Sequence, residues 1–232
     1  GVLYVAHNGV NTQFNDHVNV SSTSTGSIRF GNAAGTSMLA AGKSIRVGGA
    51  GFESGSLQLG GIAFPAGNFD LSLGNAVTLT LGPSTSFADD VTVTSGGMCL
   101  SGCTFNGKLT AVKTGSSNDN GSGNTTYNDS VHVINNGTGY MVMSNSTRDI
   151  FNAPATFSSN GTGTIYVAHK GTNTLFNENV FLNSSGGGGG VRISTGNGTA
   201  ILADGKSILA GNAGFVSGDL MLGAVTMSAT IP

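Results

Sequence analysis

Few side chains in this chain of 232 residues could act as acids or bases, because Asp and Glu together number only 11. Asp89 and Asp90 are adjacent, while Asp16 and Asp149 stand apart from them. Glycoside hydrolysis uses two carboxylates about 5–10 Å apart. Neighbouring residues of a strand point to opposite faces, so Asp89 and Asp90 do not form such a pair by themselves. The small number and the spacing of the acidic residues therefore favour a protein that is not an enzyme.

Two Gly-Lys-Ser segments, at residues 42–44 and 205–207, resemble the end of a phosphate-binding loop. Such a loop also needs a glycine five residues before its Gly-Lys pair and a helix directly after it. Ser37 and Ala200 stand where that glycine should be, and a strand pattern follows each segment. Nucleotide binding is therefore not predicted.

Histidines could bind a metal or relay protons if other ligands converged on them. His7 and His169 occupy equivalent places in a long repeat, and His17 and His132 stand beside apolar segments. Their neighbours are Asn, Gly, Val and Lys, which do not complete a metal site. We interpret these histidines as exposed or turn-facing side chains, and no catalytic, cofactor-binding or metal-binding residue is predicted.

Two further motifs are fragments of ligand-binding patterns. Residues 118–121, Asn-Asp-Asn-Gly, look like part of a calcium loop but lack its closing bidentate Glu. Thr78-Leu79-Thr80 and Thr92-Val93-Thr94 have the form of an ice-binding threonine array, yet the adjacent repeats do not continue it. A surface ion is the most that these fragments indicate.

The only two cysteines, Cys99 and Cys103, are separated by Leu-Ser-Gly. In a fully extended strand they would lie roughly 13 Å apart, too far to bridge. A turn at Ser101-Gly102 could bring them within disulfide range. A small disulfide and two buried free thiols are both compatible with the sequence.

The composition is unlike that of an ordinary globular domain. Charged residues make up 9%, Gly accounts for 39 residues, and Trp is absent. No apolar run approaches the roughly 18 residues that span a bilayer, so no membrane span is expected. A net charge of -2 without a basic stripe argues against nucleic-acid binding. Regular apolar pairs separated by Asn, Ser, Thr and Gly indicate a folded chain.

A short unit recurs along the chain: an aromatic residue, Asn, two polar residues and an aliphatic residue. Stacking of this unit would give an internal aromatic column, with a ladder of Asn amides at a corner. Phe87-Ala88 keeps the apolar frame without the Asn. The complete pairs are Phe14-Asn15, Phe105-Asn106, Tyr127-Asn128, Phe151-Asn152 and Phe176-Asn177.

A larger repeat contains the short one. Tyr4 returns as Tyr166, 162 residues later, whereas Arg29 returns as Arg192, 163 residues later. The extra residue falls in a Ser/Gly segment, as expected for a surface loop. Residues 1–162 are thus one full super-repeat and residues 163–232 are the start of the next, continuous with the first. A longer parent chain is expected.

Apolar residues at alternate positions predict a first strand in each short unit. The interval of 43 residues between Met98 and Met141 is interpreted as two turns, with residues 115–124 bulging from the stack. The predicted inward pairs are Leu3/Val5, Ile28/Phe30, Leu57/Leu59, Leu79/Leu81, Met98/Leu100, Met141/Met143, Ile165/Val167, Val191/Ile193 and Leu220/Leu222.

These patterns predict an all-β fold, a parallel β-solenoid of about ten coils of ~24 residues. A β-sandwich is the rival, because short strands at 8–12-residue spacing also suit it. Near-identical units need near-identical neighbours, which stacking supplies and a Greek key does not. The repeats therefore favour the solenoid.

Several phrases resemble those of very long repetitive surface proteins from gliding and predatory bacteria of the Bacteroidetes type. They are Tyr-Val-Ala-His (4–7 and 166–169), Leu-Gly-Pro-Ser-Thr-Ser-Phe (81–87), Gly-Thr-Gly-Tyr (137–140) and Asp-Ile-Phe-Asn (149–152). The resemblance implies type IX secretion, an extracellular cell-surface location, and a role in adhesion or in grappling-hook-like filaments. No ligand-binding residues come with it, and Cys99 and Cys103 depart from its pattern.

We therefore expect a structural repeat segment of an extracellular surface filament or adhesin, acting as a stiff rod. The expected partners are sister copies in a homo-oligomeric filament, packed through residues such as Met38, Met141 and Met143, and other cells or surfaces. The alternative is a carbohydrate-binding or carbohydrate-degrading β-helix with a groove of exposed aromatics. Burial of Phe14, Phe105 and Phe176 would remove that groove's candidates.

Overall fold

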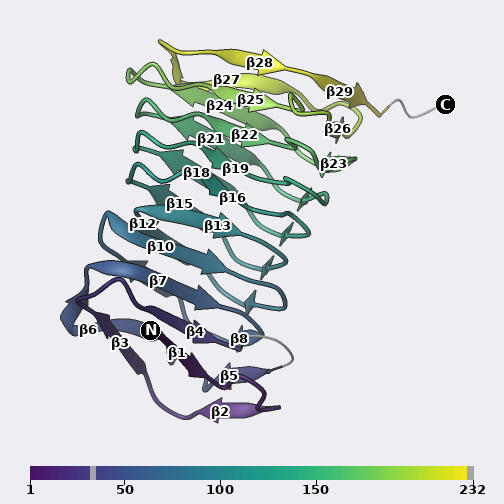
Figure 1. The fold of residues 1–232 in the computed structure, drawn as a ribbon. Helices are drawn as coiled ribbons and strands as arrows, with labels where there is room; N and C mark the ends of the chain where they lie inside the picture. Colours follow the sequence, from purple (N-terminus) through teal and green to yellow (C-terminus); the bar gives the residue numbers. More distant parts are fainter. Residues whose placement is uncertain (32–34, 229–232) are drawn as a thin grey trace.

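The computed structural model describes residues 1–31 and 35–228, and these residues form strands, turns and bends but no helix. The chain winds in one direction from coil to coil, and every strand pair is parallel (Figure 1). A complete coil contains three short strands, one on each of three faces. The predicted parallel β-solenoid is confirmed, and the antiparallel pairing of a β-sandwich does not occur among the described residues.

The faces are named here in the order in which the chain visits them. The first face contains β1 (Val2–Val5), β4 (Ser27–Phe30), β7 (Ser54–Leu59), β10 (Ala76–Leu81), β13 (Gly97–Leu100), β16 (Asp119–Asn120), β19 (Met141–Val142), β22 (Ile165–Val167), β25 (Val191–Ile193) and β28 (Leu220–Leu222). The second face contains β2 (Thr12–Phe14), β5 (Ser37–Leu39), β8 (Ile62–Phe64), β11 (Ser86–Phe87), β14 (Thr104–Phe105), β17 (Thr126–Tyr127), β20 (Ile150–Phe151), β23 (Thr174–Phe176), β26 (Thr199–Leu202) and β29 (Ala224–Met227). The third face contains β3 (Val18–Ser22), β6 (Ile45–Phe52), β9 (Phe69–Ser72), β12 (Val91–Ser95), β15 (Leu109–Lys113), β18 (Val131–Asn135), β21 (Ala155–Ser159), β24 (Val180–Ser184) and β27 (Ile208–Phe215).

The second face is one ten-stranded sheet that runs the length of the described stack. The first face is divided into two five-stranded sheets, between β13 and β16. The third face is divided into a pair, β3 and β6, and a seven-stranded sheet from β9 to β27. Nine coils carry all three strands, and β28 and β29 begin a tenth.

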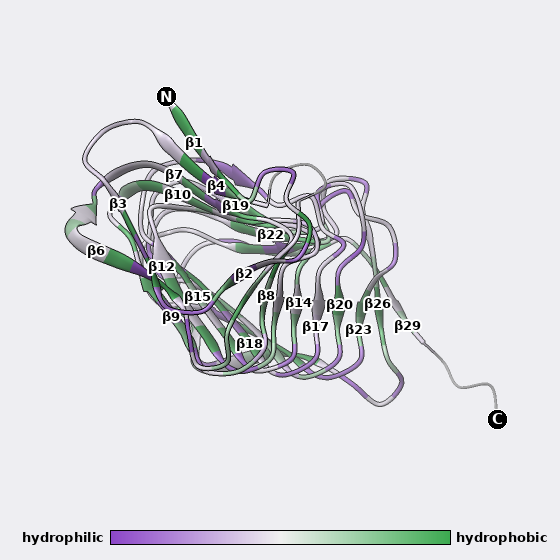
Figure 2. Ribbon diagram, turned by 90° about the horizontal axis from the view of Figure 1, so that it is seen from below, coloured by the Kyte–Doolittle hydropathy of each residue, from purple (hydrophilic) through white to green (hydrophobic). Residues whose placement is uncertain are grey.

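Alternation of apolar and polar residues sets the register of the first face. Leu79 of β10 pairs with Leu57 of β7 on one side and with Met98 of β13 on the other. All three side chains are buried. Figure 2 shows hydrophobic residues, in green, recurring along the superposed strands. Leu3 and Leu220 are exposed because they lie on the two terminal coils. The predicted inward positions are thus aligned by the pairing of the strands.

The predicted aromatic column is present inside the second face. Adjacent rings are stacked with centroids 4.6–5.4 Å apart and interplanar angles of 2–13°. Phe14 is only half-buried and contacts Phe30 instead, because Leu39 occupies the column position in the next coil. Phe64 joins the column although Pro65 replaces the motif's Asn. The stacked rings are Phe64, Phe87, Phe105, Tyr127, Phe151 and Phe176.

The Asn ladder is also present, with amide Nδ2 of each residue donating to Oδ1 of the Asn one coil earlier. The donor–acceptor distances are 2.7–2.8 Å from Asn177 back to Asn106. Asn15 does not belong to it, because Ala40 is the equivalent residue of the next coil. A second Asn–Asn hydrogen bond, which the sequence did not predict, runs from Nδ2 of Asn160 to Oδ1 of Asn136 at 3.1 Å. Each of these hydrogen bonds between Asn side chains crosses one coil boundary and therefore helps fix the stacking register.

The prediction that residues 115–124 bulge from the stack is wrong. This segment contains β16, where Asp119 pairs with Met141 and Asn120 with Val142. Gly115 stays in register through its own N–H to the Gly96 carbonyl. The strand escaped detection because Asp119, a charged residue, occupies an inward position that is apolar in neighbouring coils.

The boundary between residues 162 and 163 does not interrupt the stack. On the first face β19 pairs with β22, and on the third face β21 pairs with β24 through five residue pairs. The coil that begins the second copy of the super-repeat is therefore packed on the last coil of the first copy.

Candidate functional site

Lys113 and Asp119 form an ion pair inside the solenoid. Nζ of Lys113 lies 2.9 Å from Oδ2 of Asp119, and the two side chains are 0% and 4% exposed. The ammonium also donates to two backbone carbonyl oxygens. The carboxylate accepts the N–H of Met98 at 3.0 Å and the hydroxyl of Ser117 at 3.0 Å. Both charges are thus surrounded by hydrogen-bonding partners, as a buried ion pair requires.

The ion pair belongs to a column of buried polar side chains at the corner between the third and first faces. Asn135 donates from Nδ2 to the carbonyl of Gly139 at 3.0 Å. Ser159 donates from Oγ to the carbonyl of Gly163 at 2.9 Å. These bonds pair backbone carbonyls that the tight corner would otherwise leave unsatisfied. The column comprises Ser95, Lys113, Asn135, Ser159 and Ser184, which are paired in register.

Asp149 is a second buried acid, at the corner between the first and second faces. Its Oδ2 accepts the hydroxyl of Ser144 at 2.6 Å, and its Oδ1 accepts the N–H of Thr125 at 2.8 Å. Burial raises its pKa to about 6, although the hydrogen bonds oppose this rise. Burial also raises the pKa of the nearby Tyr127 hydroxyl well above its ordinary value. Asp149 is 1% exposed, so this corner is a protonation site inside the scaffold.

We predict that Asp149 makes the solenoid less stable as the pH rises from about 4 to 7. The folded chain binds the proton more tightly than the unfolded chain, whose carboxyl titrates near 3.8. Its contribution is therefore complete below pH 3.8 and is lost as the pH rises through about 6. The loss amounts to roughly 3 kcal/mol. Thermal unfolding of wild type and Asp149→Asn at several pH values measures it, because Asn does not titrate. Parallel pH profiles for the two proteins would contradict the prediction.

Both cysteines are free thiols, so of the two alternatives the disulfide is not formed. Cys103 is buried, and its Sγ lies 3.4 Å from the carbonyl oxygen of Gly82. Cys99 is half-buried on the outer side of β13, beside Thr80 of β10. Burial raises the pKa of both thiols, and that of Cys103 to about 12.

Cys103 is expected to resist alkylation until the solenoid unfolds. A thiol of pKa about 12 has on the order of a thousandfold less thiolate near pH 8 than one at the ordinary value of 9.0. Mass mapping after brief iodoacetamide treatment, with and without denaturant, measures the difference. Equal labelling of Cys103 in both conditions would show that the corner opens readily.

Asp89 and Asp90 contact different coils and do not act as a pair. Oδ2 of Asp89 accepts the N–H of Gly67 in the preceding coil at 2.6 Å. Oδ1 of Asp90 accepts the N–H of Lys108 in the following coil at 2.9 Å. Each carboxylate therefore links backbone segments at the corner before the third face.

The two Gly-Lys-Ser segments form turns, and the strands β6 and β27 follow them as predicted. Lys43 pairs with Asp16 of the preceding coil at 2.9 Å. Lys206 pairs with Glu178 at 2.7 Å. Lys43 also lowers the pKa of Asp16 through its hydrogen bond. Both lysines thus serve as links between coils on the surface.

His17 and His132 have partners in adjacent coils. Nδ1 of His17 accepts the N–H of Ser44 at 3.0 Å. At the equivalent place in the second copy, Oδ1 of Asn179 accepts the N–H of Ser207 at 2.9 Å. Nε2 of His132 lies 3.0 Å from Oγ of Ser158. Burial lowers the pKa of His132, and Lys108 adds to this effect.

His7 and His169 pack against the rings of nearby tyrosines, a contact that the sequence did not predict. The ring centroids of His7 and Tyr4 are 4.6 Å apart, and those of His169 and Tyr166 are 5.0 Å apart. A Cβ added to Gly196 would lie 2.4 Å from Cε1 of His169, so the imidazole lies directly on that glycine. The two histidines are therefore held in equivalent surface positions.

The calcium-loop fragment does not converge on one point, because Asp119 is turned into the interior while Asn118 and Asn120 are exposed. The threonine pairs lie on different faces, Thr78-x-Thr80 on the first and Thr92-x-Thr94 on the third. Within residues 1–31 and 35–228, no group of three His, Cys, Asp or Glu side chains is placed to hold a metal ion.

The methionines differ from the predicted lateral contacts. Met38 is 43% exposed on the second face, as that prediction requires. Met141 and Met143 are each 1% exposed, because the alternation of the first face directs both into the core. The prediction is therefore wrong for these two residues.

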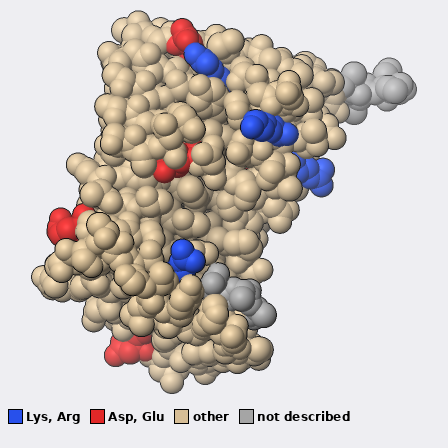
Figure 3. Space-filling view, viewed as in Figure 1, with Lys and Arg blue, Asp and Glu red and all other residues tan. Residues whose placement is uncertain are grey.

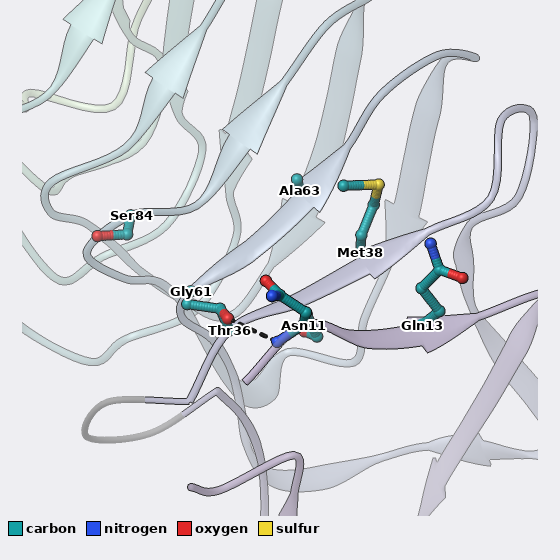
Figure 4. A pocket seen from close by; sticks show the side chains of 8 residues that line it. Asn11, Gln13, Thr36, Met38, Gly61, Ala63 and Ser84 are labelled. Carbon is teal, nitrogen blue, oxygen red and sulfur yellow. Dashed lines mark hydrogen bonds between the residues drawn. The ribbon is translucent and has the colours of Figure 1, made fainter. Parts of the chain in front are cut away.

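A shallow hollow of about 390 Å³ surrounds Met38 on the second face (Figure 4). Asn11, Gln13 and Ala63 also line it, and the N–H of Asn11 donates to Oγ1 of Thr36 at 2.9 Å. All the lining side chains are uncharged. The hollow offers apolar and amide contact, without groups for acid–base chemistry.

Charged side chains are widely spaced on the face shown in Figure 3. They do not form a continuous basic or acidic patch there. The part of the chain that the structure describes includes no helix long and apolar enough to cross a membrane.

Comparison with known proteins gives no assignment. No protein-family model matches the chain. No curated protein and no solved structure matches it either.

Proposed function

We propose that the chain is a structural repeat segment of an extracellular surface filament or adhesin, in which it serves as a stiff rod. The observation that carries this proposal is the unbroken second-face sheet of ten parallel strands. Each coil adds about 4.8 Å to the length of such a stack. A tandem repeat of this kind therefore provides length, which an attachment structure needs in order to contact a distant surface.

The side chains support rigidity. The aromatic column and the Asn ladder link successive coils, and the surface ion pairs Lys43–Asp16 and Lys206–Glu178 do the same at a corner. Bending would separate these contacts at every coil boundary. A rod that transmits force or holds a distant adhesive tip would benefit from this arrangement.

The sequence resemblance supports the surface location. We propose type IX export, sister copies as filament partners, and other cells or surfaces as targets.

Electron microscopy of the purified chain tests the proposal. Nine coils at about 4.8 Å each make a single chain only about 43 Å long, so we expect narrow rods of uniform width where chains associate end to end at high concentration. Size-exclusion chromatography with light scattering gives the mass of each species. Assemblies that grow equally in all directions, or flexible strings, would overturn the proposal of a stiff rod.

The predicted carbohydrate groove is not formed by the motif aromatics. Phe105 and Phe176 are buried in the column, and Phe14 is half-buried against Phe30. Asp89 and Asp90 are engaged with backbone groups of different coils. Incubation with polysaccharides checks the expected absence of an enzyme, and any released product would refute it.

A further inference from the structure

A second hollow, of about 250 Å³, lies on the outside of the first face near residue 166. It differs from the hollow around Met38 because aromatic, amide and cationic side chains line it together. They come from three successive coils, so the stacking register creates the site. The lining side chains used below are Asn120, Tyr140, Asn145, Tyr166, His169 and Lys170.

Tyr166 is the centre of this site and is held by its neighbours. Its ring lies edge to face with that of Tyr140, at 5.9 Å, and with that of His169, at 5.0 Å. The guanidinium of Arg192 lies 5.5 Å from the ring centroid, and Arg192 also donates to the Tyr166 hydroxyl at 3.4 Å. The same guanidinium forms an ion pair with Asp219, with Nη2 of Arg192 2.7 Å from Oδ2 of Asp219. The tyrosine is thus oriented before any ligand arrives.

The internal repeat shows which outward residues differ between copies. Five outward positions carry different residue types in the two copies of the super-repeat, although the stacking of both copies is the same. The exchanged pairs are Gln13/Leu175, Asn19/Phe181, Met38/Ile201, Arg46/Leu209 and Gln58/Met221.

In contrast, three of the outward residues around Tyr166 are the same in both copies, whereas Lys170 stands where the first copy has Asn8. Tyr166, His169 and Arg192 correspond to Tyr4, His7 and Arg29. Their geometry recurs as well, with Arg29 6.0 Å from the Tyr4 ring centroid. These aromatic and charged residues, which are half-buried in the second copy, are retained where the five outward positions above have diverged, and this points to a role beyond packing.

The chemistry of the site indicates its ligand. The face of a sugar ring presents C–H groups, which pack on aromatic rings, and its hydroxyls suit the amides of Asn120 and Asn145. Lys170 adds a positive charge, and none of the lining side chains is a carboxylate. Burial lowers the pKa of His169, which keeps its imidazole neutral and suited to packing or hydrogen bonding.

We propose that this hollow binds one acidic sugar unit of a glycan, a uronic acid or a similar carboxylate-bearing sugar. Its volume is below the roughly 300–1,000 Å³ of sites that enclose drug-sized ligands, so a single unit fits best. The proposal rests on the adhesin function proposed above and names its target. The Tyr, His and Arg of the site recur in the first copy, so several weak sugar contacts along a long chain would raise its avidity. The positive charge of Lys170 does not recur, because Asn8 occupies that position in the first copy.

Isothermal titration calorimetry of the purified chain tests this proposal, because its signal does not depend on the tyrosine that the key variant removes. The probes are oligogalacturonates and uncharged cello-oligosaccharides of matched length. Wild type is expected to bind the acidic probe more tightly. Tyr166→Ser should weaken binding by about tenfold or more through loss of the ring contact. Lys170→Asn, which installs the residue of the first copy, should reduce the preference for the acidic probe.

The matched control is Phe181→Asn, which removes a surface aromatic from the third face of the same coil and installs the residue of the first copy. It should bind like wild type, and circular dichroism should show all variants folded. Absence of binding to both probes, or an equal loss in Phe181→Asn and Tyr166→Ser, would overturn the proposal. Equal affinity for the two probes would overturn the acidic preference. Because binding is measured on single chains, these outcomes do not depend on whether the chains form filaments.

Discussion

Replacing Lys113 with Met is expected to lower the free energy of unfolding by about 3–5 kcal/mol. The variant leaves the Asp119 carboxylate inside the solenoid without its counter-charge, 2.9 Å from where Nζ had been. The hydrogen bonds from Met98 and Ser117 remain, but they do not replace a full positive charge. The variant should therefore be one of the most destabilising single changes in the chain.

A double-mutant cycle identifies the origin of this loss. Asp119→Met places an apolar residue in register with Met141, and combining it with Lys113→Met removes both charges. The double variant should recover most of the lost stability, because apolar replacement of a buried ion pair is often neutral or favourable. Lys43→Met, which breaks an exposed pair with Asp16, is the control and should change the stability by about 1 kcal/mol or less. Similar losses for Lys43→Met and Lys113→Met, in denaturant titrations, would show that burial of the pair is not decisive.

Phe105→Ala is expected to destabilise the stack by about 3–5 kcal/mol. Phe105 lies between Phe87 and Tyr127, with ring centroids 5.2 and 5.4 Å away. Removing the ring leaves a cavity that neighbouring coils cannot fill, since their positions are fixed by strand pairing on three faces. The loss should appear as a lower midpoint in thermal and denaturant unfolding.

Two controls separate the column from general hydrophobicity. Phe105→Leu should cost less than the alanine variant, because Leu39 and Leu202 occupy the same position in other coils. Phe181→Ala removes a half-exposed ring on the third face and should have a small effect. If Phe105→Ala were as mild as Phe181→Ala, the aromatic column would not be a principal source of stability.

Strand alternation and the Phe-Asn motif were sufficient to predict the solenoid, the aromatic column and one Asn ladder. These features depend on local spacing, which repetition makes visible. The strand β16 could not be found in this way. A charged residue such as Asp119 is typical of a loop, and the sequence does not show that Lys113 lies beside it. Phe64 was missed because Pro65 replaces the Asn that marks the motif.

The surface site was only partly visible in the sequence. Recurrence singled out His7 and His169, but their local neighbours suggested no partners. Tyr140 and Asn120 belong to the two preceding coils, and only the stacking register brings them beside Tyr166. Contacts between coils depend on the exact length of each turn, which composition does not reveal.

The central claim is that the super-repeats form one continuous rod, and the length of chains with added repeats tests it most directly. Seven first-face strands, β1 to β19, precede the strand β22 that begins the second copy. Chains of one, two and three copies of residues 1–162, followed by residues 163–232, should lengthen by about 34 Å per added copy at about 4.8 Å per coil. Small-angle scattering and electron microscopy should show a constant cross-section at every length. Growth in width, or separate particles joined by flexible links, would contradict a continuous solenoid.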